Sequence, residues 1–157
     1  MTDEDNPSEL LTLSYQADAD GTGKLKVMAA SHGFAGVSSA WFDTASLQVF
    51  ARSLSTYPLA DDDHPCVHGG FGANPRTDSP AQEHVRIEVG PVGLKGQIGI
   101  WVHLSTEVWP EARSEQFYEV RLELLTTYER LRVFSIHLLR VLDGDLSEAI
   151  IGGEFMI

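Results

Sequence analysis

Alternation of apolar and polar residues is the feature that most constrains this fold. It occurs at residues 84–89, 94–104 and 117–126. Because successive side chains of a strand point to opposite faces, a period of two indicates strands with one buried face. Modest connections between consecutive strands favour antiparallel pairing. The second half of the chain therefore predicts an antiparallel meander.

The first part of the chain predicts a hairpin and a helix. Residues 9–18 and 24–32 alternate on either side of a glycine-containing turn at residues 20–23. Residues 41–54 carry apolar side chains at helical spacing, with Asp43 or Thr44 as a possible cap at the start of the helix, and Pro58 ends it.

A second amphipathic helix is predicted over Thr127–Asp143, with most of its apolar side chains on one broad arc. Val133 and Ile136 lie outside that arc, which indicates cover by another element or another chain. The tail, residues 145–157, is apolar enough to dock on the core or to contact a second copy.

Residues 58–83 predict one long acidic loop, because they combine four prolines, three glycines and the run Asp61-Asp62-Asp63 with almost no periodicity. The whole pattern predicts a single α+β domain over residues 1–157. We expect an antiparallel sheet of about five strands with two helices packed on it, in the order β-β-α-β-β-β-α. A chain of 157 residues with 43% hydrophobic residues is long enough for one such core.

The net charge of the chain limits the classes of partner that it can bind. Twenty-three acidic residues against 11 basic ones give a net charge of −12, which repels nucleic acid and anionic lipid and attracts a cationic partner. The acidic start of the chain lacks the features of a signal peptide, and no apolar run is long enough to span a bilayer, so we expect a cytoplasmic protein. Cys66 is the only cysteine, which excludes an intrachain disulfide.

The polar phase of the meander predicts one shared outward face. Its members are His84, Arg86, Glu88, Lys95, Gln97, Trp101, His103, Glu119, Arg121 and Glu123. Trp101 is unusual in a polar phase: either the 58–83 loop covers it, or it anchors a partner. The residues predicted to bind a partner are Asp61, Asp62, Asp63, Trp101, Glu119, Arg121 and Glu123.

No catalytic motif is present. The glycine-rich run at residues 68–72 has no accompanying Gly-x-Ser-x-Gly elbow, and no glycine loop has the spacing of a phosphate-binding motif. His64, Cys66 and His68 are zinc-type ligands, but their spacing matches no established metal motif. We therefore predict no enzyme and no cofactor, and keep a metal-binding protein or small enzyme that uses these three residues as the alternative.

The chain resembles the WapI-type bacterial immunity proteins of polymorphic toxin systems. The matching stretches are Gly33-Phe34-Ala35-Gly36 leading into Trp41-Phe42-Asp43, a first helix ending Leu54-Ser55-Thr56-Tyr57-Pro58, His84-Val85-Arg86-Ile87-Glu88-Val89, Gly96-Gln97-Ile98-Gly99-Ile100-Trp101-Val102, and Val120-Arg121-Leu122-Glu123-Leu124 before the final helix. The order of elements matches over residues 10–142. The family often has an acidic residue before that helix, where this chain has Thr126-Thr127.

The resemblance implies a non-catalytic protein that binds and blocks a cognate toxin domain in the cytoplasm. Our leading hypothesis is accordingly a binding protein that neutralises a basic protein by occlusion. A homodimer with Trp101, Val133 and Ile136 in its interface is a further interpretation.

Overall fold

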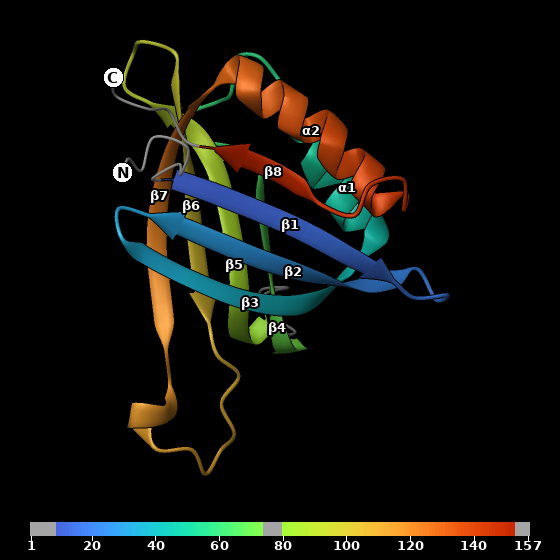
Figure 1. Ribbon diagram of the computed structural model, residues 1–157, viewed down its shortest axis with the longest axis vertical. Helices are drawn as coiled ribbons and strands as arrows, with labels where there is room; N and C mark the ends of the chain where they lie inside the picture. Colours follow the sequence, from blue (N-terminus) through green and yellow to red (C-terminus); the bar gives the residue numbers. More distant parts are fainter. Residues whose placement is uncertain (1–8, 74–79, 153–157) are drawn as a thin grey trace, which may run out of the picture.

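The computed structural model describes residues 9–73 and 80–152, which form eight strands and two α-helices (Figure 1). The strands make two antiparallel four-stranded sheets. Sheet A has the order β3 (Phe34–Asp43), β2 (Thr22–Ser31), β1 (Glu9–Ala17), β8 (Ala149–Gly152). Sheet B has the order β4 (Cys66–Ala73), β5 (Pro80–Val92), β6 (Gln97–Ser105), β7 (Glu119–Thr127).

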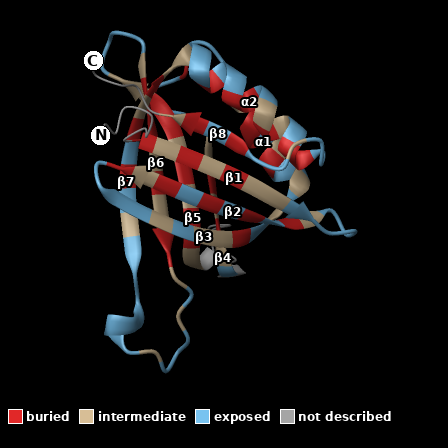
Figure 2. Ribbon diagram, in the orientation of Figure 1, coloured by how far each residue is buried: buried red, intermediate tan, exposed pale blue. Residues whose placement is uncertain are grey.

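The two sheets pack face to face with their strands crossing steeply (Figure 1). Strand β3 runs across sheet B and contacts all four of its strands. This is the orthogonal form of sheet packing, in which the core lies between the two inner faces. In Figure 2 buried residues alternate with more exposed ones along the strands. The buried apolar residues of both sheets form one hydrophobic core.

The period-two pattern explains this layering. In β2, Leu25, Val27 and Ala29 are buried, while the alternate positions Lys24 and Lys26 are exposed. Strand β6 buries Ile98, Ile100, Val102 and Leu104 in the same way. The predicted hairpin and meander strands are therefore present, with ends that differ by a few residues.

Side chains of sheet A also bond to the backbone of β7, the last strand of sheet B. The hydroxyl of Ser31 donates to the carbonyl of Glu123 at 3.0 Å, and the amide of Leu125 donates to the carboxylate of Glu9 at 3.3 Å. Ser31 and Glu9 are both buried. Two backbone groups at this edge of sheet B therefore have hydrogen-bond partners from the other sheet.

The two helices lie together at one end of the sandwich. α2 (Tyr128–Leu142) packs on α1 (Thr44–Ser53) and on β8, and the hydroxyl of the buried Ser135 donates to the carbonyl of Ala51 at 2.6 Å. Thr127 caps α2 by accepting from the amide of Arg130, so the predicted helix is confirmed. Neither helix, within the described residues, is long and apolar enough to cross a membrane.

The prediction of about five strands in the order β-β-α-β-β-β-α is only partly right. The class is α+β with two helices, but the order is β-β-β-α-β-β-β-β-α-β. The helix predicted within residues 41–54 begins at Thr44 with Asp43 as its N-cap, one of the two predicted caps, and Trp41–Asp43 belong to β3. Strand β3 was missed because its inward positions are small: a Cβ on Gly36 would lie 2.6 Å from Cγ1 of Val120. Position 36 is a glycine because the two sheets pack closely there, and not because it lies in a linker.

Residues 58–83 also differ from the predicted loop. They contain β4 and the start of β5, while residues 74–79 lie outside the described residues. Gly69 of β4 lies under Phe42, and a Cβ there would be 2.7 Å from Cζ of that ring. The tail was expected to dock on the core or on a second copy. Its first part docks, because β8 pairs with β1, whereas residues 153–157 lie outside the described residues.

Truncating a core residue of α2 tests this packing. Leu131 is fully buried, so Leu131→Ala should lower the free energy of unfolding by about 2–5 kcal/mol, through lost apolar contact and a residual cavity. Val133 lies on the same helix but is 37% exposed, so Val133→Ala serves as the control and should cost less than about 1 kcal/mol. Urea unfolding followed by circular dichroism measures both, and equal costs would contradict the described orientation of α2.

Candidate functional site on the outer face of sheet B

The residues that face away from the core on β4 to β7 form the outer face of sheet B. The strand register aligns them in two rows that cross all four strands. One row is Cys66, Glu88, Trp101 and Glu123, and the next is His68, Arg86, His103 and Arg121. Sequence-distant polar groups thus become direct cross-strand neighbours.

A β-bulge changes which residues belong to this face. Val85 pairs with Gly69 and Glu83 pairs with Gly70, so His84 is the extra residue on β5. Its side chain is 1% exposed, packs edge-on against Phe71 and hydrogen-bonds to Gln82, and burial lowers its pKa. The prediction that His84 points outward is therefore wrong. Glu83 joins the outer face instead, and nothing in the local sequence pattern marks this exchange.

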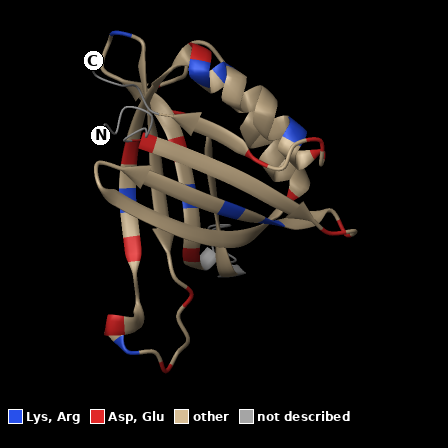
Figure 3. Cartoon of the chain, viewed as in Figure 1, with Lys and Arg blue, Asp and Glu red and all other residues tan. Residues whose placement is uncertain are grey.

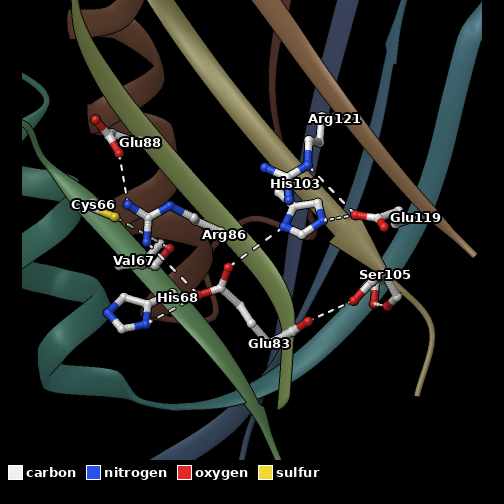
Figure 4. Close-up of polar contacts among 11 residues, drawn as sticks. Cys66, Val67, His68, Glu83, Arg86, Glu88, His103, Ser105, Glu119 and Arg121 are labelled. Atoms are coloured by element: carbon white, nitrogen blue, oxygen red, sulfur yellow. Dashed lines mark hydrogen bonds and ion pairs between the residues drawn. The ribbon is translucent and has the colours of Figure 1, made fainter. Parts of the chain in front are cut away.

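Glu83 is the centre of a network of ionisable side chains (Figure 4). Its carboxylate lies 3.6 Å from Nδ1 of His68, 3.7 Å from Nδ1 of His103 and 3.9 Å from Arg86. Arg86 also donates to Glu88 at 2.9 Å. These contacts bring together three strands of sheet B through one carboxylate.

The network continues onto β7. Nε2 of His103 lies 2.8 Å from the carboxylate of Glu119, which is also 3.7 Å from Nε of Arg121. His103 therefore bridges Glu83 on β5 and Glu119 on β7 (Figure 4). Three of the residues predicted to share this face, His103, Glu119 and Arg121, do lie together.

Trp101 lies flat on the sheet beside this network. A Cβ on its neighbour Gly99 would be 2.8 Å from Cζ2 of the indole, so only glycine leaves room for the ring. Gly90 pairs with Gly99 and is covered by the ring of His64, whose centroid lies 5.6 Å from that of Trp101. Two adjacent glycines thus provide a floor for two aromatic rings.

The sequence left open whether residues 58–83 cover Trp101 or whether it anchors a partner, and the structure shows partial cover. His64, from the segment before β4, covers one side of the indole, and the side chain remains partly exposed. The indole N–H donates to the carboxylate of Glu123 at 2.8 Å. Within residues 9–73 and 80–152, Glu123 has no cationic partner.

A shallow cavity of about 330 Å³ opens between these side chains. It is lined on the outer face by Arg86, Glu88, Trp101, His103, Arg121 and Glu123. An aromatic face beside a carboxylate that has no cationic partner in the described part of the chain suits a positively charged group, which is attracted both to the indole and to the charge of Glu123.

The other predicted contact residues lie nearby in the chain but outside the network. Asp61, Asp62 and Asp63 are exposed in the segment that precedes His64. Because His64 packs on Trp101 and its Nδ1 donates a 2.7 Å hydrogen bond to the carboxylate of Glu88, this acidic segment is held at the border of the outer face. Gln97 is partly buried at the start of β6, and Lys95 is exposed in the turn before it.

His64, Cys66 and His68 do not converge on one point. His64 is bonded to Glu88, and His68 faces Glu83. Burial raises the pKa of the Cys66 thiol, which keeps the thiol protonated and a weak ligand and nucleophile at neutral pH. In the described part of the chain, no group of three or more His, Cys, Asp or Glu residues has an arrangement that could hold a metal ion.

Comparison of the chain with protein families, with characterised proteins and with solved structures finds no match. The resemblance to WapI-type immunity proteins therefore stays a prediction.

The His64–Glu88 contact should produce a pH-dependent contribution to stability. The hydrogen bond from His64, with the ion pair to Arg86, lowers the pKa of Glu88 below its usual value of 4.5. A carboxyl with a lowered pKa stabilises the fold above its unfolded pKa, and this contribution is lost as the pH falls through the folded pKa. Glu88→Gln should therefore be less stable than the wild type at pH 7, and the difference should shrink below about pH 4.5.

Urea unfolding at pH 7, 5 and 3.5 measures this difference. Glu148→Gln removes one exposed carboxylate from the turn before β8 and corrects for the change in net charge. If Glu88→Gln loses as much stability relative to the wild type at pH 3.5 as at pH 7, the ionised carboxylate of Glu88 does not stabilise the fold in the way described.

Proposed function

We propose that this protein is a non-catalytic binding protein that occludes a basic protein partner with the outer face of sheet B. The observation that carries the proposal is the pair Trp101 and Glu123 beside the 330 Å³ cavity. The indole is fixed by its hydrogen bond, while the carboxylate has no cationic partner among the described residues.

The pair suits a lysine or arginine side chain of the partner. Such a side chain can lie along the indole and place its charge near Glu123, with Glu88 at the other rim of the cavity. Tryptophan is among the residues that contribute most to binding at interfaces, because it buries a large area at low entropic cost. Both partners of the proposed contact are already held in place, which reduces the cost of ordering them on binding.

Arg86 and Arg121 add selectivity to this face. Arg86 is matched by Glu83 and Glu88, and Arg121 lies near Glu119, so each cation sits beside an acidic group. A partner must therefore place its cations near Glu123 and away from the two arginines, because like charges in close contact oppose binding.

The net charge of −12 supports long-range attraction to such a partner. Figure 3 shows acidic residues on β7, on the turns and at the helix ends. Asp61, Asp62 and Asp63 extend this acidic surface at the border of the outer face. Electrostatic steering of this kind raises the association rate and is weakened by salt.

The resemblance described above supports a narrower form of the proposal. If the chain is immunity-like, the partner is a toxin domain in the cytoplasm, and a nuclease toxin presents a cationic cleft to nucleic acid. An acidic face with an aromatic anchor can occupy such a cleft and exclude the phosphate backbone.

A pull-down from the native cell lysate tests this proposal. The baits are the wild type, the double variant Trp101→Ala/Glu123→Gln, and the matched control Trp109→Ala/Glu115→Gln, which alters an exposed tryptophan and glutamate in the β6–β7 connection. A basic protein should be retained by the wild type and the control and released by high salt. Loss of a central anchor should weaken its binding by at least about 30-fold in the double variant.

Circular dichroism and thermal unfolding establish that both variants are folded. Retention of the same partner by Trp101→Ala/Glu123→Gln would show that another face binds it. With the purified partner, an association rate that does not change with salt would contradict electrostatic steering.

A further inference from the structure

The outer face of sheet A differs in character from the rest of this acidic protein. Its outward residues come from all four strands: Leu10, Thr12, Ser14, Gln16, Lys24, Lys26, Met28, Ala30, Ala35, Val37, Ser39, Trp41 and Ile150. Met28, Val37, Trp41 and Ile150 are exposed apolar side chains. Asp43, at the end of β3, has the same phase as Trp41 and is the one carboxylate on this side of the described strands. In Figure 3 the lysines of β2 are the blue part of that strand.

Lys24 and Lys26 are free to meet an anion. Within the described residues neither lysine has an ion-pair partner, whereas Arg86, Arg113, Arg121 and Arg132 all lie near carboxylates. The two lysines are separated by one residue on β2, so they point to the same side of the sheet about 7 Å apart.

Strand β3 leaves one edge of sheet A open. It is the last strand of that sheet, and no described strand pairs with its far edge. Two of the other three sheet-terminal strands differ: β7 receives Ser31 and Glu9 from sheet A, and β8 packs on α2. The third, β4, pairs only with β5 among the described strands. β3 also lacks the lysines and prolines that commonly protect an edge, and its single charge is Asp43 at its end.

Two hollows border β3 near Val37. The larger, of about 580 Å³, is lined by Ser14, Gln16, Lys24, Lys26, Ser39 and Glu107 among others. The smaller, of about 120 Å³, lies between Ala35, Val37, Thr106 and Tyr118. The larger hollow thus extends from β3 over the outer face of sheet A, and the smaller lies between β3 and the adjoining ends of β6 and β7. Both hollows can receive side chains of a segment bound at Val37.

We propose that β3 binds an extended acidic peptide segment, which adds to sheet A as a fifth strand. The main chain of the segment pairs with the open edge of β3, as in other cases of strand addition. Its carboxylates meet the lysines of β2, and its apolar side chains cover Val37 and the exposed residues around it.

The register of sheet A explains how a lysine on β2 can reach a strand beyond β3. Lys26 pairs with Ser14 on one side and with Ser39 on the other, so it stands between two small side chains. Its long side chain can lean across Ser39 toward the added strand. Lys24 pairs with the bulky Trp41, so we expect Lys26 to be the main contact.

The spacing of the lysines favours a peptide over a single anion. Two acidic side chains separated by one residue on an extended segment have the same spacing as Lys24 and Lys26 on β2. Glu107 at the rim of the larger hollow repels acidic groups, so removing its charge should strengthen binding. This proposal does not depend on the proposed function, because it concerns the other sheet and the opposite charge.

Titration with a defined probe tests the proposal. The probe is a fluorescein-labelled octapeptide that alternates valine and glutamate, and the reference probe alternates valine and glutamine. The acidic probe should bind more tightly than the reference. Lys26→Gln should weaken it about threefold to fivefold, as expected for one solvated ion pair. Lys95→Gln, which removes an exposed lysine of the β5–β6 turn, is the matched control and should bind as the wild type does.

Amide NMR locates the site independently of affinity. Addition of the acidic probe should shift the amide signals of residues 34–43 and slow their hydrogen exchange, and Glu107→Gln should bind the probe more tightly. Equal affinity of wild type and Lys26→Gln, or shifts confined to sheet B, would overturn the proposal. Sedimentation that shows a dimer, with β3 amides protected only at high protein concentration, would assign the edge to a second copy instead.

Discussion

Burial of one face of each sheet against the other is the constraint on which the remaining structure depends. Because the strands have a period of two, fixing Leu25 or Ile100 in the core also fixes the outward position of its neighbours. The steep crossing further requires small residues where β3 meets sheet B, and Gly36 against Val120 is the closest such contact described above. The two outer faces are thus consequences of core packing, although neither contributes much to the core.

The bulge at His84 shows how one backbone irregularity decides the composition of the outer face. Without it, the regular alternation would bury Glu83 and expose His84. With it, the carboxylate of Glu83 lies near His68, Arg86 and His103, and the imidazole of His84 is buried beside Phe71. A buried neutral imidazole with a hydrogen-bond partner is tolerated, whereas a buried lone carboxylate would carry a large desolvation cost.

The sequence predicts the elements whose signals are local. α2 carries its own cap and apolar arc, and β6 and β7 alternate without interruption, so their positions and the neighbourhood of Trp101, Arg121 and Glu123 could be predicted. Strands β3 and β4 could not, because their glycines meet side chains that are distant in sequence. Gly69, for example, lies under Phe42, and no local pattern distinguishes that contact from a flexible loop. The position of His64 could not be predicted for the same reason, because its ring packs on Gly90, a residue of β5 that is distant in the sequence.

Net charge alone also describes this surface poorly. A total of −12 suggests a uniformly acidic molecule, yet charges act over about 8 Å at physiological salt. Lys26 is paired with Ser14 and Ser39, and the hollow beside it is lined by Lys24 and by one carboxylate, that of Glu107. These charges next to Lys26 therefore contribute more to the local field than the net charge of the chain suggests. The core lies between this patch and the Trp101–Glu123 pair. Stacked sheets lie about 10 Å apart, so exposed groups on the two outer faces are separated by more than the Debye length and salt largely screens them from each other. One acidic chain can therefore present sites of opposite charge preference.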